Sequence, residues 1–189
     1  MKITFVIGGA RSGKSSFALN QASKIEGPRV YIATAEALDE EMKARIEKHR
    51  VERGSGWDTH EEPLNLSDAL MKTKDKYKVA VVDCLTIWLS NLMMRTQNIE
   101  PRSRTREETM QDFTDMLLKL KHSSVCSPGS GLCVLYIVTN EVGMGIVPEN
   151  SLARLFRDLA GDLNQEVAAV ADEVFLVTAG IPLKLKDQR

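Results

Sequence analysis

The chain has 189 residues and a formal net charge of -1 at pH 7, a size that corresponds to one domain spanning residues 1–189. Apolar residues make up 43% of the chain and charged residues 27%, which is typical of a globular protein. A charge so close to zero gives no electrostatic footprint for nucleic acid or for an anionic membrane. We therefore expect one globular domain that binds neither.

The cysteines and the N-terminus indicate the compartment. Cys84, Cys126 and Cys133 form an odd set without a disulfide framework, and their spacing matches no common zinc pattern. The apolar run Met1–Ile7 leads directly into a glycine-rich loop without a cleavage site, so we interpret it as a buried strand rather than a signal peptide. No apolar run reaches the length of a membrane span. We expect a cytoplasmic protein.

Short apolar runs alternate with helical patterns along the chain. The expected strands are Ile3–Ile7, Val30–Ala33, Val79–Asp83, Leu132–Thr139 and Glu173–Thr178. Helical patterns lie near Lys14–Ser23, Asp39–Arg50, Leu66–Lys72, Thr86–Met94, Arg106–Leu120 and Ser151–Ala171, and loops are expected at Thr96–Thr105 and Ser123–Gly131. Strands rich in Val and Ile are typical of a parallel sheet covered on both faces. The alternation predicts an α/β fold, a three-layer sandwich around a mostly parallel sheet.

The first strand runs into a phosphate-binding pattern, G-x-x-x-x-G-K-[ST]. It comprises Gly8, Gly9, Ala10, Arg11, Ser12, Gly13, Lys14 and Ser15. Glycines allow the backbone to approach phosphates closely, and the N–H groups of the loop and the next helix supply positive charge. Lys14 would face the β- and γ-phosphates, and Ser15 would offer its hydroxyl to Mg²⁺. The pattern predicts a P-loop NTPase-like sandwich that binds a nucleoside triphosphate; the alternative is a strand–turn–helix corner with coincidental glycines.

Asp83 ends the apolar run Val79–Val82. The carboxyl ends of parallel strands are where α/β sheets bind ligands, and P-loop enzymes place a carboxylate associated with Mg²⁺ there. We favour this role over a helix cap for the segment that follows.

A phosphate loop alone leaves three classes of protein open. They are a small-molecule kinase or nucleotidyltransferase, an ATP-driven motor, and a GTPase-like switch. The guanine-reading pattern Asn-Lys-x-Asp of switch proteins does not follow any expected strand, which argues against the third class.

Further motifs narrow the choice. In chain order they are Tyr31–Ala35, Asp39–Met42, Arg45–Arg50, Trp57–Pro63, Val82–Thr86, Thr139–Asn150, Leu152–Arg154, Phe156–Asp158, Ala160–Gly161 and Asn164–Gln165. With the phosphate loop, this ordered set closely resembles the bifunctional adenosylcobinamide kinase / adenosylcobinamide-phosphate guanylyltransferase family of cobalamin biosynthesis. The resemblance covers nearly the whole chain and is weakest across Met94–Thr105 and Ser123–Gly131.

The resemblance implies two reactions and a corrinoid substrate. In the first, ATP or GTP phosphorylates the hydroxyl on the aminopropanol arm of adenosylcobinamide. In the second, GTP guanylylates a histidine of the enzyme with release of pyrophosphate. The GMP then passes to adenosylcobinamide phosphate to give adenosyl-GDP-cobinamide. The family also implies a homo-oligomer, specifically a trimer, and a relative that keeps only the kinase activity is the alternative.

The chain has three histidines, His49, His60 and His122, and His49 matches the nucleophile of the family. A neutral imidazole attacks an α-phosphorus with little activation. The alternative is an exposed helix residue.

The resemblance assigns a further set of residues to guanine-nucleotide contacts. The set is Thr34, Ala35, Glu36, Arg50, Val51, Glu52, Arg53, Glu61 and Asp83. Relatives commonly carry Arg-Pro where this chain has Arg53-Gly54. Thr139–Asn150 is expected at the ligand edge of the sheet, either as a corrinoid contact or as the lead into a helix capped by Asn150.

Overall fold

The computed structural model describes residues 1–37, 39–96, 105–123 and 131–187. Most of the two expected loops, at 97–104 and 124–130, lies outside these residues. The elements of the described chain are β1 (Lys2–Gly8), α1 (Lys14–Ala22), β2 (Arg29–Ala33), α2 (Glu40–Arg53), β3 (Asp58–Glu61), α3 (Leu66–Thr73), β4 (Val79–Asp83), α4 (Leu85–Thr96), α5 (Arg106–Ser123), β5 (Val134–Asn140), α6 (Ser151–Val170), β6 (Glu173–Thr178) and β7 (Ile181–Asp187).

Within the described chain the strands form one sheet in the order β3-β2-β4-β5-β1-β6-β7. All neighbouring pairs are parallel except β6 and β7, which form an antiparallel hairpin at one edge. β5 lies between β1 and β4, so that Gly8, Asn140 and Asp83 end adjacent strands at the same edge of the sheet. The predicted parallel α/β sandwich is confirmed.

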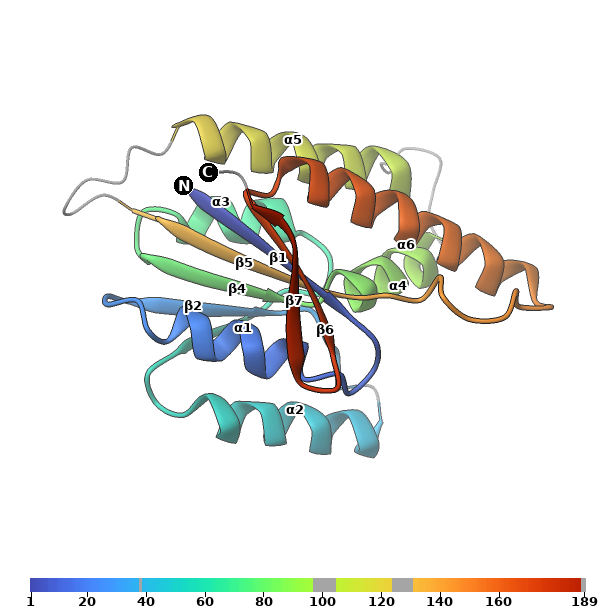
Figure 1. The fold of residues 1–189 in the computed structure, drawn as a ribbon, viewed down its shortest axis with the longest axis horizontal. Helices are drawn as coiled ribbons and strands as arrows, with labels where there is room; N and C mark the ends of the chain where they lie inside the picture. The colour runs from blue at the N-terminus through green and yellow to red at the C-terminus, as the bar shows by residue number, and fades with distance from the viewer. Residues whose placement is uncertain (38, 97–104, 124–130, 188–189) are drawn as a thin grey trace.

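Helices cover both faces of the sheet (Figure 1): α1 and α2 lie on one side, and α3 to α6 on the other. Strand residues alternate between the two cores. Ile3 and Phe5 belong to the cluster under α3–α6, whereas Val6 packs in the cluster that includes Ala18 and Ala22 of α1. Trp88 anchors the larger core, with its ring centroid 5.1 Å from that of Phe113.

Two strands at the edges of the sheet carry weak sequence signals. β3 is Asp-Thr-His-Glu, and all four of its residues are exposed. Neither β3 nor β7 was among the expected strands. The residues of β7 are largely exposed, alternate apolar and basic side chains and include Pro182. A proline is tolerated at a sheet edge, where no neighbouring strand needs its missing N–H.

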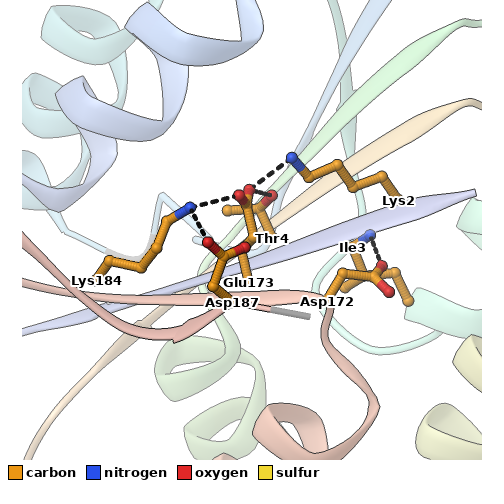
Figure 2. Close-up of polar contacts among 7 residues, drawn as sticks. All are labelled: Lys2, Ile3, Thr4, Asp172, Glu173, Lys184 and Asp187. Carbon is orange, nitrogen blue, oxygen red and sulfur yellow. Dashed lines mark hydrogen bonds and ion pairs between the residues drawn. The ribbon is translucent and has the colours of Figure 1, made fainter. Parts of the chain in front are cut away.

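An ion-pair cluster joins β1, β6 and β7 near the start of β1, at the opposite end of that strand from Gly8 (Figure 2). Glu173 at the start of β6 accepts contacts from Lys2 and Lys184, each at 2.7 Å, which connects β1, β6 and β7. Asp172 accepts a hydrogen bond from the Ile3 N–H at 2.7 Å and pairs with Lys121 of α5 at 2.8 Å. These charges hold the start of β1 between the helical layer and the hairpin.

The two carboxylates are stabilised in their charged form. Burial raises the pKa of Asp172, but the Ile3 N–H and the Lys121 ammonium outweigh burial and hold that pKa below its ordinary value. Burial acts on Glu173 in the same way, and the hydrogen bonds from Lys184 and Lys2 lower its pKa overall. A carboxylate with a lowered pKa in the folded state stabilises the fold above its unfolded pKa, and the contribution is lost as the pH falls through the folded value.

We predict that Asp172→Asn lowers the free energy of unfolding by about 1–2 kcal/mol at pH 7, because a hydrogen bond to a charged group contributes roughly this much. The difference from the unsubstituted chain should begin to shrink as the pH falls through about 4, where the unfolded chain takes up its proton. It should be lost only below the lowered pKa of the native carboxylate. Urea denaturation across this pH range measures this. Asp187→Asn is the control, because the exposed pair between Asp187 and Lys184 at 3.5 Å should contribute less than about 0.5 kcal/mol. Equal losses in the two variants would contradict the prediction.

Candidate nucleotide-binding site

The phosphate loop leaves β1 at Gly8 and enters α1 at Lys14. Arg11 at φ 56° and Gly13 at φ 92° both have left-handed backbone conformations, which turn the chain from strand to helix. Two hydrogen bonds fix the loop to its neighbours. The Glu141 N–H donates to the Gly8 carbonyl at 3.1 Å, and the Gly180 N–H donates to the Ser12 carbonyl at 2.8 Å. The end of β5 and the turn between β6 and β7 therefore hold the loop in place.

Close packing explains the first glycine of the pattern. A Cβ at Gly8 would lie 2.5 Å from both the Ser12 Oγ and the Val177 carbonyl oxygen. One of these neighbours is backbone that the sheet holds, so no larger residue fits without moving the loop. The tight loop leaves its backbone N–H groups next to the start of α1, where anions bind.

Lys14 is buried inside the loop. The residue is only 8% exposed, and its Nζ donates to the Gly9 carbonyl at 3.1 Å. The Ser12 Oγ is also buried and has no hydrogen-bond partner among the described residues. A buried ammonium is costly without a compensating anion. This arrangement fits a bound phosphate group.

Asp83 lies at the end of β4, where its Oδ2 accepts a hydrogen bond from the Tyr31 hydroxyl at 2.6 Å. Burial raises the pKa of Tyr31 well above its ordinary value, and Asp83 raises it further, so the hydroxyl keeps its proton. Burial, reinforced by Asp83, raises the pKa of the Cys84 thiol to about 12 against the opposing charge of Lys14. Cys84 therefore stays a neutral thiol next to the phosphate loop.

Thr34 holds the backbone next to Asp83. Its Oγ1 donates to the Cys84 carbonyl and accepts from the Cys84 N–H, both at 2.8 Å, and its own N–H donates to the Asp83 carbonyl at 3.1 Å. Thr34 is fully buried. The structure therefore gives it a role in fixing the ends of β2 and β4, whereas a direct nucleotide contact stays a prediction.

A pocket of about 540 Å³ lies between α2, the segment after β2 and the end of β3. Its lining residues are Ala35, Glu36, Ala37, Lys43, Ile46, Glu47, Arg50, Glu61 and Pro63. Four of the residues assigned by resemblance, Ala35, Glu36, Arg50 and Glu61, thus meet in one place. Arg50 pairs with Glu61 at 2.9 Å and Glu36 pairs with Arg95 at 3.0 Å.

Of the residues assigned at the end of α2, Val51 and Arg53 are not among the described residues that line this pocket. The Arg53 guanidinium lies 4.0 Å from the centroid of the Tyr31 ring and also donates to the Thr59 Oγ1 at 3.3 Å. Val51 is 71% exposed, and the side chain of Glu52 lies outside the description. Gly54 ends the helix at φ 69°, an angle that a proline ring does not allow. The departure from Arg-Pro therefore changes how α2 ends.

His49 lies on α2 and is exposed. Successive helix residues are about 100° apart, so His49 lies on the face next to the one that Ile46 and Arg50 turn toward the pocket. Asp39 caps the start of this helix, because its Oδ1 accepts from the Met42 N–H at 2.7 Å. The other two histidines are also exposed: His60 lies on β3 and His122 in the last turn of α5.

Polar groups at the end of β5 were only partly anticipated. The Thr86 Oγ1 accepts from the Asn140 N–H at 2.6 Å and lies 3.2 Å from the Thr139 Oγ1. The Asn164 amide donates to the Asn140 carbonyl at 3.5 Å. Thr86 and Asn164 are distinguished by being polar and buried, and burial cannot be read directly from a sequence. Asn150 caps α6 through the Leu152 N–H at 2.8 Å, which confirms the expected cap, whereas a corrinoid contact by Thr139–Asn150 stays a prediction.

No group of three or more His, Cys, Asp or Glu side chains that would suit a metal ion occurs among the described residues. Mg²⁺ commonly binds one or two protein ligands together with substrate phosphates. Ser15 in the first turn of α1 and Asp83 at the end of β4 fit that mode. In the part of the chain that the structure describes, no helix is long and apolar enough to cross a bilayer.

These features define a P-loop nucleotide-binding protein with an α/β sandwich fold. A solved structure of an ATPase from the type III secretion system of pathogenic bacteria has the same fold. Its TM-score is 0.56 at 11% sequence identity, over 94% of this chain and 51% of that one. This likeness extends to the fold alone.

The chain belongs to the cobinamide kinase / cobinamide phosphate guanyltransferase family, whose model matches residues 4–185. It is 41% identical over 182 residues to the bifunctional adenosylcobalamin biosynthesis protein CobU of Salmonella typhimurium strain LT2, covering 96% of this chain and 98% of that protein. The protein of the same name from Escherichia coli strain K12 is 38% identical over the same shares of the two chains. The CobP protein of Pseudomonas aeruginosa strain PAO1 is 36% identical, covering 97% of this chain and 96% of the relative.

Proposed function

We propose that the chain catalyses both reactions of its family in cobalamin biosynthesis. It phosphorylates adenosylcobinamide with ATP or GTP, and it transfers GMP from GTP to adenosylcobinamide phosphate. The observation that carries the proposal is the pairing of a phosphate loop containing a buried Lys14 with a separate pocket beneath α2. Relatives of 36–41% identity over nearly their whole length favour this enzyme over a motor ATPase.

The phosphate loop suits the kinase reaction. The substrate hydroxyl attacks the γ-phosphorus, the bond to the β–γ bridging oxygen breaks, and the nucleoside diphosphate leaves. Lys14 and the N–H groups of the loop stabilise the charge that spreads over the transferring oxygens. Ser15 and Asp83 would hold Mg²⁺, which neutralises phosphate charge when it is bound.

The helix α2 suits the guanylyl transfer. A ring nitrogen of His49 attacks the α-phosphorus of GTP, an N–P bond forms, and pyrophosphate leaves. A phosphate oxygen of the corrinoid then attacks the same phosphorus and releases the imidazole. Lys43 and Arg50 line the adjacent pocket and supply positive charge for the triphosphate.

We also propose that copies of the chain associate into a trimer, as the family resemblance suggests. The edge strand β7 supports association, because Ile181 is 70% exposed and Leu183 is 59% exposed. An exposed apolar edge strand tends to pair or to be covered. Size-exclusion chromatography with light scattering should give a molar mass of about three times the 21.0 kDa of one chain. A mass of 21.0 kDa would contradict the proposal.

Lys14→Ala should reduce both activities. The loss of a charge that stabilises the transition state typically lowers a rate by roughly a hundredfold or more. Kinase and guanylyl-transfer rates of the purified variant, checked for folding by circular dichroism, measure the effect. Near-normal rates for both reactions would overturn the assignment of the phosphate loop.

His49→Ala should separate the two activities. The variant should form no covalent GMP adduct and no adenosyl-GDP-cobinamide, because the nucleophile is gone. Kinase turnover should persist within a few-fold, because γ-phosphoryl transfer needs positioning and charge rather than a histidine. Labelled GTP and a corrinoid phosphorylation assay measure the two outcomes on one preparation.

His60→Ala is the matched control, since His60 is also exposed and lies on β3, the strand that follows α2 in the chain. It should keep both activities. A GMP adduct that persists in His49→Ala would show that another residue is the nucleophile. Loss of both activities in a folded, nucleotide-bound variant would contradict their separation at His49.

A further inference from the structure

Tyr31 touches both parts of the site at once. It lies in the middle of β2 and is 3% exposed, with its side chain on the α1 side of the sheet. The hydroxyl donates to the Asp83 Oδ2 at 2.6 Å. The face of the same ring lies 4.0 Å from the Arg53 guanidinium. One side chain thus joins the end of β4 to the last turn of α2.

The contact with Asp83 fixes the orientation of the carboxylate. A hydrogen bond on one carboxylate oxygen restricts rotation of the side chain and leaves the other oxygen directed elsewhere. Partners of this kind orient the groups that bind a metal, and their removal typically weakens metal affinity by roughly 10–100-fold. Tyr31 is too deeply buried to serve as a surface contact, so its hydroxyl has this one evident use.

The contact with Arg53 is one of several that hold the end of α2, since Arg53 also donates to the Thr59 Oγ1 and Arg50 pairs with Glu61 at 2.9 Å. None of the α2 side chains that the structure describes is buried, and most are exposed. A guanidinium over an aromatic ring is attractive, and more so when the pair is partly shielded from water. Trp57 joins the same cluster, with its ring nearly perpendicular to that of Tyr31 at a centroid distance of 6.4 Å. The C-terminal end of α2 is therefore attached through Tyr31.

We propose that Tyr31 is a positioning residue that orients Asp83 for Mg²⁺ and couples that carboxylate to helix α2 through Arg53. The inference rests on the proposed role of Asp83. It adds a physical connection between the phosphate loop, where the kinase reaction occurs, and the helix that carries His49. A change at Asp83 on binding Mg²⁺ and nucleotide is transmitted to Arg53 and Trp57, since Tyr31 contacts all three.

The chain offers a matched control for the hydroxyl. Tyr31, Val81 and Tyr136 lie side by side on β2, β4 and β5, and both tyrosines are buried in the same core cluster. Tyr31→Phe removes the hydroxyl from Asp83 and keeps the ring under Arg53. Tyr136→Phe removes a hydroxyl from the same level of the sheet without that contact. Circular dichroism and urea denaturation check that both variants fold.

The first readout is the kinase rate as a function of Mg²⁺ at saturating nucleotide and corrinoid. Tyr31→Phe should raise the half-saturating Mg²⁺ by roughly tenfold and leave the maximal rate nearly unchanged, as expected for a metal-orienting partner. Tyr136→Phe should leave the titration unchanged, and Asp83→Asn should shift it at least as far as Tyr31→Phe. If Tyr31→Phe leaves the Mg²⁺ titration unchanged while Asp83→Asn shifts it, this inference is overturned. An unchanged titration in Asp83→Asn overturns the proposed Mg²⁺ role of Asp83 instead.

The second readout is the emission of Trp57. The chain has two tryptophans, so Trp88→Phe leaves Trp57 as the sole reporter. With a non-hydrolysable GTP analogue bound, adding Mg²⁺ should change the Trp57 emission, and Tyr31→Phe in the same background should reduce that change at least twofold. A structural role for Tyr31 would not move this signal. Absence of any change with Tyr31 in place, or an equal change in Tyr31→Phe, would overturn the coupling.

Discussion

The buried ammonium of Lys14 sets the main constraint on this molecule. It lies in a loop with no room for a side chain at Gly8, against the Gly9 carbonyl. A charge in this position is costly unless a phosphate group compensates it. The loop must therefore be held from outside, and the Glu141 and Gly180 N–H groups do this from β5 and from the β6–β7 turn. Three strands of the sheet, β1, β5 and β6, therefore end beside this loop.

The opposite part of the site is held loosely. Helix α2 is capped by Asp39 at one end and attached through Arg53 at the other, and its described side chains are largely in water. His49 lies on the outer part of this helix, next to the pocket rather than in its lining. Group transfer through an enzyme-bound intermediate requires the nucleophile to meet first GTP and then the corrinoid phosphate. A helix with few buried contacts has a low cost of local movement, which suits this alternation.

The sequence predicted the central layer of the fold because the signals there are strong. The runs around Ile3, Val81 and Ile137 are apolar and buried, and the glycine-rich loop between β1 and α1 has one common structural solution. β3 and β7 lie at the edges of the sheet and carry polar or alternating residues. Their pairing depends on tertiary context, so neither β3 nor β7 was among the strands expected from the sequence.

The site shows the same division. Local patterns located Lys14 and Ser15 after the phosphate loop and Asp83 at the end of an apolar strand, and resemblance to the family supplied His49 and the residues around α2. The roles of Tyr31 and Thr34 depend on contacts across 52 and 50 residues of sequence. Such contacts become visible only when the strands are assembled, because no local pattern specifies a partner so far along the chain.

In the proposed function, one chain carries a histidine nucleophile for GMP in addition to a phosphate loop. The most direct measurement is incubation of the unsubstituted protein with α-labelled GTP and Mg²⁺, followed by proteolysis under alkaline conditions and mass spectrometry of the labelled peptide. We expect a single GMP adduct, acid-labile and alkali-stable, on His49 in a peptide from α2. An unlabelled protein that still phosphorylates the corrinoid, or a GMP adduct on any other residue, would contradict this expectation.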